Sequence, residues 1–94
     1  MMAVYVDDMK APYRGMIMCH MMADTNHELI AMAIKIGVNP RWIQKEGSVY
    51  EHFDISMGKR KLAVQAGAIE MTRKDLIRKM VMGRKEATAN EANT

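Results

Sequence analysis

The sequence predicts one small α/β domain of the α+β kind, in which a short mixed sheet of three to four strands packs with three helices in the order β-β-α-(β)-α-β-α. Its length of 94 residues suits a single domain, and 49% of the residues are hydrophobic. Two capping boxes, each followed by apolar residues at helical spacing, indicate helices, and short apolar runs between them indicate strands. We expect a compact domain over residues 1–83 and a disordered polar tail over residues 84–94.

The first half of the chain is expected to form two strands and a helix. Residues 3–6 and residues 16–22 are the predicted strands, and residues 10–15, which contain Pro and Gly, predict the loop between them. Thr25 and Glu28 form a capping box, so a helix is expected to begin there. Its core-facing stripe and its stop signal are Leu29, Met32, Ala33, Ile36 and Gly37.

The second half is expected to begin with a short strand at residues 41–44, followed by an extended stretch at residues 50–56. Ser56 is expected to cap a second helix. A strand at residues 68–71 and a third helix, which opens with a second capping box at Thr72, complete the domain. The residues expected to face the core from these two helices are Leu62, Ala63 and Ala66, then Leu76, Ile77, Met80 and Val81.

Composition indicates a reducing compartment and no membrane partner. The single cysteine, Cys19, cannot form an internal disulfide bond. No signal peptide is visible, and the longest apolar run, residues 16–23, is too short to span a bilayer, so we expect a soluble cytoplasmic protein. The 12 methionines favour an adaptable core or a subunit interface, and we expect a homo-oligomer, although Met could also simply replace Leu and Ile.

The net charge of +3 conceals an uneven distribution. Residues 1–57 carry a net charge of −2, residues 58–85 carry +7, and residues 86–94 carry −2. A basic half next to an acidic half indicates either an anionic partner or the solvated outer faces of two helices.

The stretch at residues 50–56 carries the strongest functional signal. Side chains alternate between the two faces of an extended segment, so His52 and Asp54 share one face while their apolar neighbours face the other. A cationic helix start follows, where the helix dipole disfavours cations unless an anion lies nearby. The cations are Lys59, Arg60 and Lys61.

Three further polar residues could join this site, and each has a structural alternative. Asp7 ends the first predicted strand, where open α/β sheets bind ligands, but Asp is also common in turns. His20 lies in an apolar run, which is more typical of a hydrogen-bonded core histidine. Asp24 could cap the first helix or direct its carboxylate toward the site.

Taken together, these landmarks resemble the domain-of-unknown-function family 4031, which comprises small bacterial and phage proteins. The resemblance covers roughly residues 2–82, and Phe53 stands where relatives usually have Tyr. It implies a compact α/β domain with a shared polar cluster and implies no activity. The matching segments are residues 3–7, 19–25, 28–29, 37–38, 52–55, 59–60 and 66–68.

The leading hypothesis from the sequence is a binding module for a small anionic, nucleotide-like ligand. A cluster of His, Asp and Arg without a recognisable catalytic motif favours recognition over turnover. As a phage-encoded protein it would sequester or regulate its ligand in the host cytoplasm. The expected ligand-binding residues are Asp7, His20, Asp24, His52, Asp54, Lys59 and Arg60.

The first alternative is an enzyme, a metal-dependent phosphoester hydrolase. A divalent metal ion would be its cofactor, held by His20, His52, Asp54 and Asp7, and the catalytic residues would be His52, Asp54 and His20. The spacing matches no compact zinc motif, and no phosphate-binding loop or nucleophile elbow is present. The sequence leaves open whether the chain is an enzyme.

The second alternative is a module that binds a nucleic-acid backbone or another protein through the basic surface of residues 59–79. The chain has only five aromatic residues, so base stacking is poorly provided for and nucleic acid is not the favoured partner. A purely structural role for the His and Asp residues also stays open, because most buried polar groups simply form hydrogen-bonded networks.

Overall fold

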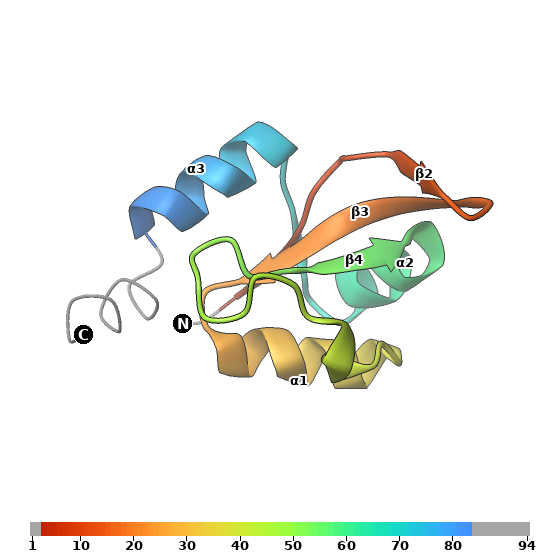
Figure 1. The fold of residues 1–94 in the computed structure, drawn as a ribbon, viewed down its shortest axis with the longest axis horizontal. Helices are drawn as coiled ribbons and strands as arrows, with labels where there is room; N and C mark the ends of the chain where they lie inside the picture. Colours follow the sequence, from red (N-terminus) through yellow and green to blue (C-terminus); the bar gives the residue numbers. More distant parts are fainter. Residues whose placement is uncertain (1–2, 84–94) are drawn as a thin grey trace.

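The computed structural model describes residues 3–83, which form five strands and three α-helices. The strands are β1 (Val4–Val6), β2 (Ala11–Tyr13), β3 (Met16–Ala23), β4 (Phe53–Ser56) and β5 (Ile69–Glu70). The helices are α1 (Asn26–Ile36), α2 (Met57–Gln65) and α3 (Arg73–Gly83), with a 3-10 helix η1 (Pro40–Trp42). Figure 1 shows the sheet between α3 on one face and α1 with α2 on the other. The α+β class is confirmed, with more strands than expected, and the predicted tail lies outside the described residues.

The sheet is built around β3, the longest strand. It pairs antiparallel with β4 along one edge and with β1 and then β2 along the other, so that Met21 lies opposite both Val6 and Phe53. β5 adds to the far side of β1 in parallel, which makes the sheet mixed. Every other strand is therefore positioned, directly or through β1, by the backbone of β3.

The expectation of a loop over residues 10–15 is wrong, because residues 11–13 form β2. Arg14 and Gly15 have φ angles of 49° and 79° and make the tight turn of a two-residue hairpin between β2 and β3. Pro12 is tolerated because β2 lies at the edge of the sheet, where a missing N–H breaks no ladder. Pro12 and Gly15 correctly predict a turn, but the same residues argue against a strand, so the short strand β2 is not predicted.

The expected strand at residues 41–44 is also wrong. The Asn39 side chain accepts a hydrogen bond from the Arg41 N–H and Pro40 opens the helical turn, so the chain forms η1 instead. Only Gln44 pairs with the sheet, through an isolated bridge to His52. This bridge joins the loop to the start of β4.

Alternation along β3 divides the interior into two apolar clusters on opposite faces of the sheet. On the first face, Met21 and the fully buried Phe53 pack against α1 and α2. On the second face, Tyr5 and Met22 pack under α3. Each such fully buried side chain contributes about 1.5–3 kcal/mol of hydrophobic stabilisation, so the first, larger cluster carries most of the stability.

The helix caps form as predicted. Thr25 and Ser56 accept hydrogen bonds from the N–H groups of Glu28 and Lys59, and Thr72 does so for Asp75. The predicted core stripe of α1 is buried in full. In the other two helices, Leu62 and Val81 are exposed instead of buried, because each is next to a core-facing residue and therefore rotated from it by about 100° around the helix.

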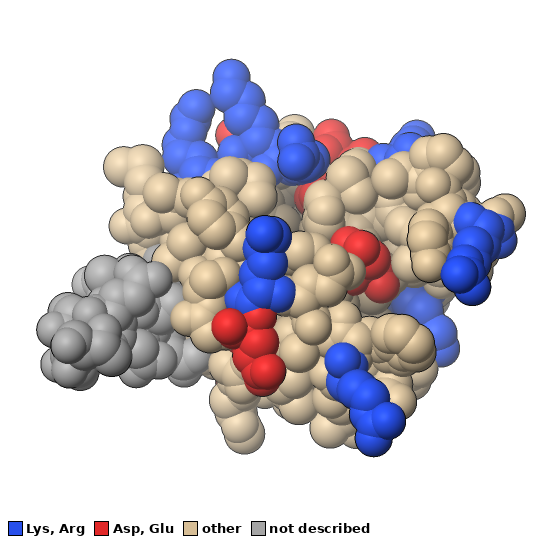
Figure 2. Space-filling view, viewed as in Figure 1, with Lys and Arg blue, Asp and Glu red and all other residues tan. Residues whose placement is uncertain are grey.

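The basic residues of α2 and α3 do not form one surface. The two helices lie on opposite faces of the sheet, so the cations of residues 59–61 are separated from those of residues 73–79 (Figure 1). Figure 2 shows Lys and Arg side chains gathered over α3, while other charged groups are scattered singly. None of the helices within residues 3–83 is long and apolar enough to cross a membrane.

The end of α1 allows a first prediction. Gly37 has a φ angle of 81°, and a Cβ atom there would lie 3.0 Å from the Lys59 Nζ. Because an L-residue pays about 1–2 kcal/mol for the left-handed conformation, Gly37→Ala should lower the free energy of unfolding by at least about 1 kcal/mol. Urea denaturation followed by circular dichroism measures this change.

Gly58→Ala is the matched control. Gly58 lies in the first turn of α2, and a Cβ atom there would be 3.9 Å from the Ser56 Oγ, an ordinary contact. The same substitution should therefore raise the free energy of unfolding by about 0.4–1 kcal/mol. Two shifts of the same sign would contradict this account of Gly37.

Candidate functional site

Three polar side chains form a row across neighbouring strands on the second face of the sheet. His20 of β3 lies directly opposite Asp54 of β4. On the other edge of β3, the Asp7 N–H donates to the His20 carbonyl at 3.1 Å, which extends the β1–β3 pairing by one residue. Because these residues are in register, their side chains project to the same face, the one that α1 and α2 do not cover.

His52 completes this group. It precedes β4 by one residue and lies two residues from Asp54, so it faces the same side, as the alternation in the sequence predicts. The rings of His20 and His52 meet edge to face, with their centroids 5.0 Å apart. We call Asp7, His20, His52 and Asp54 the histidine–aspartate cluster.

Asp7 fixes the orientation of His20. Its Oδ2 lies 2.7 Å from the His20 Nδ1, and its Oδ1 accepts the N–H groups of His20 and Met9 at 2.8 and 3.2 Å. Burial raises the pKa of Asp7, which is only 1% exposed, but the hydrogen bonds and the charge of His20 outweigh burial and leave the pKa below its ordinary value. An ionised carboxylate only accepts, so the proton of His20 resides on Nδ1.

The second imidazole is fixed in the same way. The His52 Nδ1 lies 2.8 Å from the carbonyl oxygen of Tyr50, and a carbonyl can only accept, so Nδ1 is again the donor. In each neutral ring the Nε2 then presents a lone pair. These two atoms lie 3.8 Å (His20) and 3.5 Å (His52) from the same oxygen, Asp54 Oδ1. The other oxygen of Asp54 accepts the Gln44 amide at 2.7 Å, which holds the carboxylate in place.

The cluster therefore directs three electron-rich atoms at one point. Both distances exceed the usual N–H···O range. With protonated rings the contacts are ion pairs, and with neutral rings the three atoms repel one another unless a metal ion lies between them. Two ligand atoms bound to one tetrahedral zinc ion at 2.0–2.1 Å lie about 3.4 Å apart, close to the observed 3.5 and 3.8 Å. All three atoms lie within 4.8 Å of one another. Two imidazoles and one carboxylate suit Zn²⁺, Mn²⁺, Co²⁺ or Fe²⁺, and Asp7 would support the site from behind His20.

Three of the predicted site residues, Asp24, Lys59 and Arg60, lie outside the cluster. Asp24 accepts the Tyr5 hydroxyl at 3.0 Å and the Ala3 N–H at 2.9 Å, and so anchors the start of β1; burial and this carboxylate raise the pKa of Tyr5 to about 12. The Lys59 Nζ lies beside Gly37 at the C-terminal end of α1, where the helix dipole favours a cation. This contact accounts for at least one of the cations at the start of α2.

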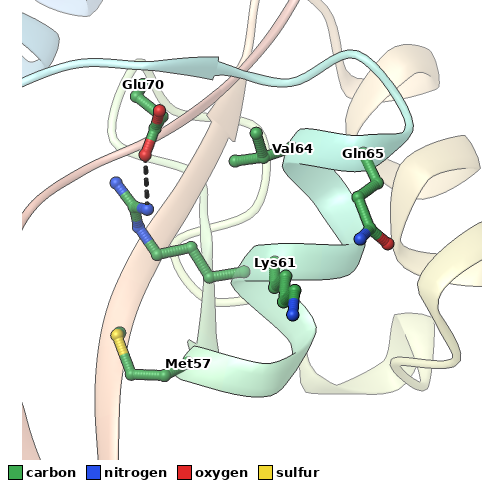
Figure 3. A pocket seen from close by; sticks show the side chains of 6 residues that line it. Met57, Lys61, Val64, Gln65 and Glu70 are labelled. Carbon is green, nitrogen blue, oxygen red and sulfur yellow. Dashed lines mark hydrogen bonds and ion pairs between the residues drawn. The ribbon is translucent and has the colours of Figure 1, made fainter.

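Arg60 supports the cluster from the opposite side of the sheet. Its Nε donates to the carbonyl oxygen of Asp7 at 3.0 Å, and its Nη1 forms an ion pair with Glu70 at 2.7 Å. Figure 3 shows this ion pair in a hollow that lies along α2 and is bounded by Glu70 of β5. Arg60 also lies near Cys19, whose pKa burial and the Asp7 charge raise to about 11, so that thiol is neutral at pH 7. Arg60 thus holds the backbone of Asp7 rather than facing the cluster.

Sequence reasoning missed Gln44 and the Tyr50 carbonyl. Both belong to the loop between η1 and β4, and they orient Asp54 and His52. A glutamine in a polar segment carries no distinctive signal, and a backbone carbonyl carries none at all. The isolated bridge between Gln44 and His52 is what brings them to the site.

The fold and the cluster define a small α+β domain with a polar site on the sheet face that also carries α3. The family model described as "Protein of unknown function (DUF4031)" matches residues 4–82, and the chain belongs to this family. No curated protein and no solved structure matches the chain. The chemistry of the site is therefore argued from its own geometry.

We expect the protein to bind one divalent ion per chain. His52→Ala should weaken the binding of Zn²⁺ or Mn²⁺ by more than about 100-fold, since it removes a ligand, whereas losing a supporting group costs about 10–100-fold. Isothermal titration calorimetry measures the affinity. His27→Ala, which removes an exposed histidine on α1, is the control and should leave binding unchanged. A wild-type protein that binds no ion would refute the site.

The contact between Asp7 and His20 gives a separate prediction. In Asp7→Asn the new amide can donate to Nδ1, which places the proton of His20 on Nε2 and blocks metal binding there. The affinity for the divalent ion should fall by about 10–100-fold, while a two-dimensional NMR spectrum should show that the variant is still folded. Asp8→Asn is the control, because Asp8 only caps the Arg73 N–H and an Asn side chain can still accept it. Equal losses in both variants would count against the supporting role of Asp7.

Proposed function

We propose that this domain is a metal-dependent hydrolase of phosphoesters that binds a divalent ion through His20, His52 and Asp54. The observation that carries the proposal is the approach of two Nε2 atoms and one carboxylate oxygen, each held in place by its own partner. Because these groups are already held in place, ordering them around an ion costs little conformational entropy.

Charge also supports a metal ion. Without one, the ionised carboxylates of Asp7 and Asp54 would repel an anion, and the two cations that the sequence suggested as phosphate ligands, Lys59 and Arg60, contact α1 and the backbone of Asp7 instead. A divalent ion offsets both carboxylates and presents a positive centre to a phosphate. The anionic ligand expected from the sequence and the metal site are thus parts of one proposal.

The surroundings of the cluster suit hydrolysis. Three protein ligands leave coordination positions for water and substrate, and the Asp54 side chain is 39% exposed, so both can enter from solvent. A bound divalent ion lowers the pKa of a water molecule and polarises a phosphoryl oxygen. Asp7 and Gln44 keep the ligands from turning while these groups exchange.

The start of α3 provides cations beside the cluster. Asp8 follows Asp7 and its Oδ1 accepts the Arg73 N–H at 2.8 Å, so α3 begins next to the cluster. Arg73 and Lys74 are exposed there, and Figure 2 shows basic side chains gathered over α3. These charges favour the approach of a phosphate-bearing substrate.

A second candidate is the binding module itself, with the ion holding a phosphate-bearing ligand that is not cleaved. The observation that favours it is the lack of a spare acid or base in the histidine–aspartate cluster, since each of its four side chains is used as a ligand or as a support. Sequestration, phage origin and homo-oligomer formation stay predictions from the sequence.

Turnover of bis(p-nitrophenyl) phosphate with Mn²⁺ or Zn²⁺ tests the proposal. We expect hydrolysis that EDTA abolishes and that added metal restores, and Asp54→Asn should lower kcat/KM by at least about 100-fold, because it weakens the metal site. Glu46→Gln, the same kind of change on an exposed loop, should have no effect. Metal and inorganic phosphate binding without turnover would favour the binding module instead.

A further inference from the structure

We propose that the phosphoester is a phosphodiester of single-stranded nucleic acid, bound along β3 from the start of α3 to the hairpin of β2 and β3. This inference rests on the proposed function and names its substrate class. The sequence alone does not favour nucleic acid as a partner, because the chain has few aromatic residues for base stacking. The structure places one of them, Tyr13, on the same sheet face as the cluster.

The face that carries the cluster continues into the hairpin. Met16 and Met18 precede His20 at two-residue intervals along β3, so they project to the same side. Tyr13 lies directly opposite Met16. The second face thus runs from the cluster through a strip of methionine to an aromatic side chain at the hairpin, which extends away from the helices in Figure 1.

The end of the hairpin has the chemistry of a nucleotide-stacking platform. The Tyr13 and Met16 side chains are 55% and 46% exposed. The Arg14 guanidinium lies 5.4 Å from the centre of the Tyr13 ring, so a positive charge accompanies an exposed aromatic face. A base can stack on such a ring while the cation contacts the neighbouring phosphate.

Distance favours a polymer over a single nucleotide. Met16 lies four positions before His20, a distance of roughly 13 Å along a strand. This exceeds the distance between the phosphate and the base of one nucleotide, so a mononucleotide held at the metal site would not reach Tyr13. The next nucleotides of an extended chain would reach it. Stacking on Tyr13 also needs an unpaired base, which excludes a duplex.

Charge on the other side of the cluster fits the same substrate. The start of α3 lies beside Asp8, and its exposed cations can follow a phosphate backbone. The cluster then lies between a basic helix and a stacking platform, with the reactive phosphate in the middle. The cations of α3 are Arg73, Lys74, Arg78 and Lys79.

The test compares a small phosphodiester with oligonucleotides, using one double variant and a matched control. Tyr13→Leu with Arg14→Asn removes the ring and the charge, while Asn keeps the left-handed turn that Arg14 occupies. The control is Arg41→Asn with Trp42→Leu, which alters another exposed Arg–aromatic pair, on η1 next to α1. Each protein is assayed with its metal on bis(p-nitrophenyl) phosphate, on labelled single-stranded DNA and RNA, and on duplex DNA.

We expect the wild-type protein to cleave single strands in preference to the duplex. The Tyr13 and Arg14 variant should lose at least about tenfold in kcat/KM on single strands relative to its own activity on bis(p-nitrophenyl) phosphate, mainly through KM, since stacking of one base is worth that much. The Arg41 and Trp42 control should keep the wild-type ratio. Comparing DNA with RNA identifies which polymer is the substrate.

Other outcomes separate the two proposals. Activity on bis(p-nitrophenyl) phosphate without cleavage of any oligonucleotide would overturn the nucleic-acid inference and leave the hydrolase intact. Equal ratios for both double variants, or equal cleavage of duplex and single strand, would also overturn it. No activity on either kind of substrate would overturn both.

Discussion

The ionised carboxylate of Asp7, almost fully buried at the end of β1, is the group on which the site depends. A buried charge is costly unless it is hydrogen-bonded, and Asp7 receives two backbone N–H groups and the His20 ring. Arg60 holds the carbonyl of the same residue. Removing the carboxylate would free the ring of His20 and leave the backbone N–H of that residue without its partner. This one side chain therefore both stabilises the end of β1 and orients the His20 ring.

The register of β3 makes this contact available. A shift of one residue would turn His20 into the apolar core and bring Cys19 to the site face. Two features prevent such a shift: the tight turn at Arg14 and Gly15, and the burial of Met21 and Phe53 against the helices. The apolar core thus fixes the positions of polar groups that it does not contact.

Much of this could be predicted from the sequence, because it depends on local signals. The capping residues Thr25 and Ser56, the stop at Gly37 and the shared face of His52 and Asp54 follow from the preferences and alternation of single segments. The convergence of His20 with His52 does not, because it depends on the pairing of strands more than 30 residues apart.

Other features that the sequence does not show also depend on contacts between distant residues. Lys59 and Arg60 looked like ligands for an anion because the sequence cannot show which helix end or backbone carbonyl lies next to them. The position of Asp24 just before the first helix allows its carboxylate either to cap that helix or to face the site, but in the structure the Tyr5 hydroxyl and the Ala3 N–H bind this carboxylate at the start of β1. β2 was missed because Pro12 is disfavoured in all but edge strands.

The alternation of buried and exposed side chains along β3 affects how this domain can evolve. Cys19 and Met21, on the first face, are fully buried, and substitutions there act on folding. Even-numbered positions from Met16 to His20 are at least partly open to solvent, and substitutions there alter what the face can bind. A single strand therefore carries two nearly independent sets of sites, and new specificities can be selected on one set without loss of stability through the other.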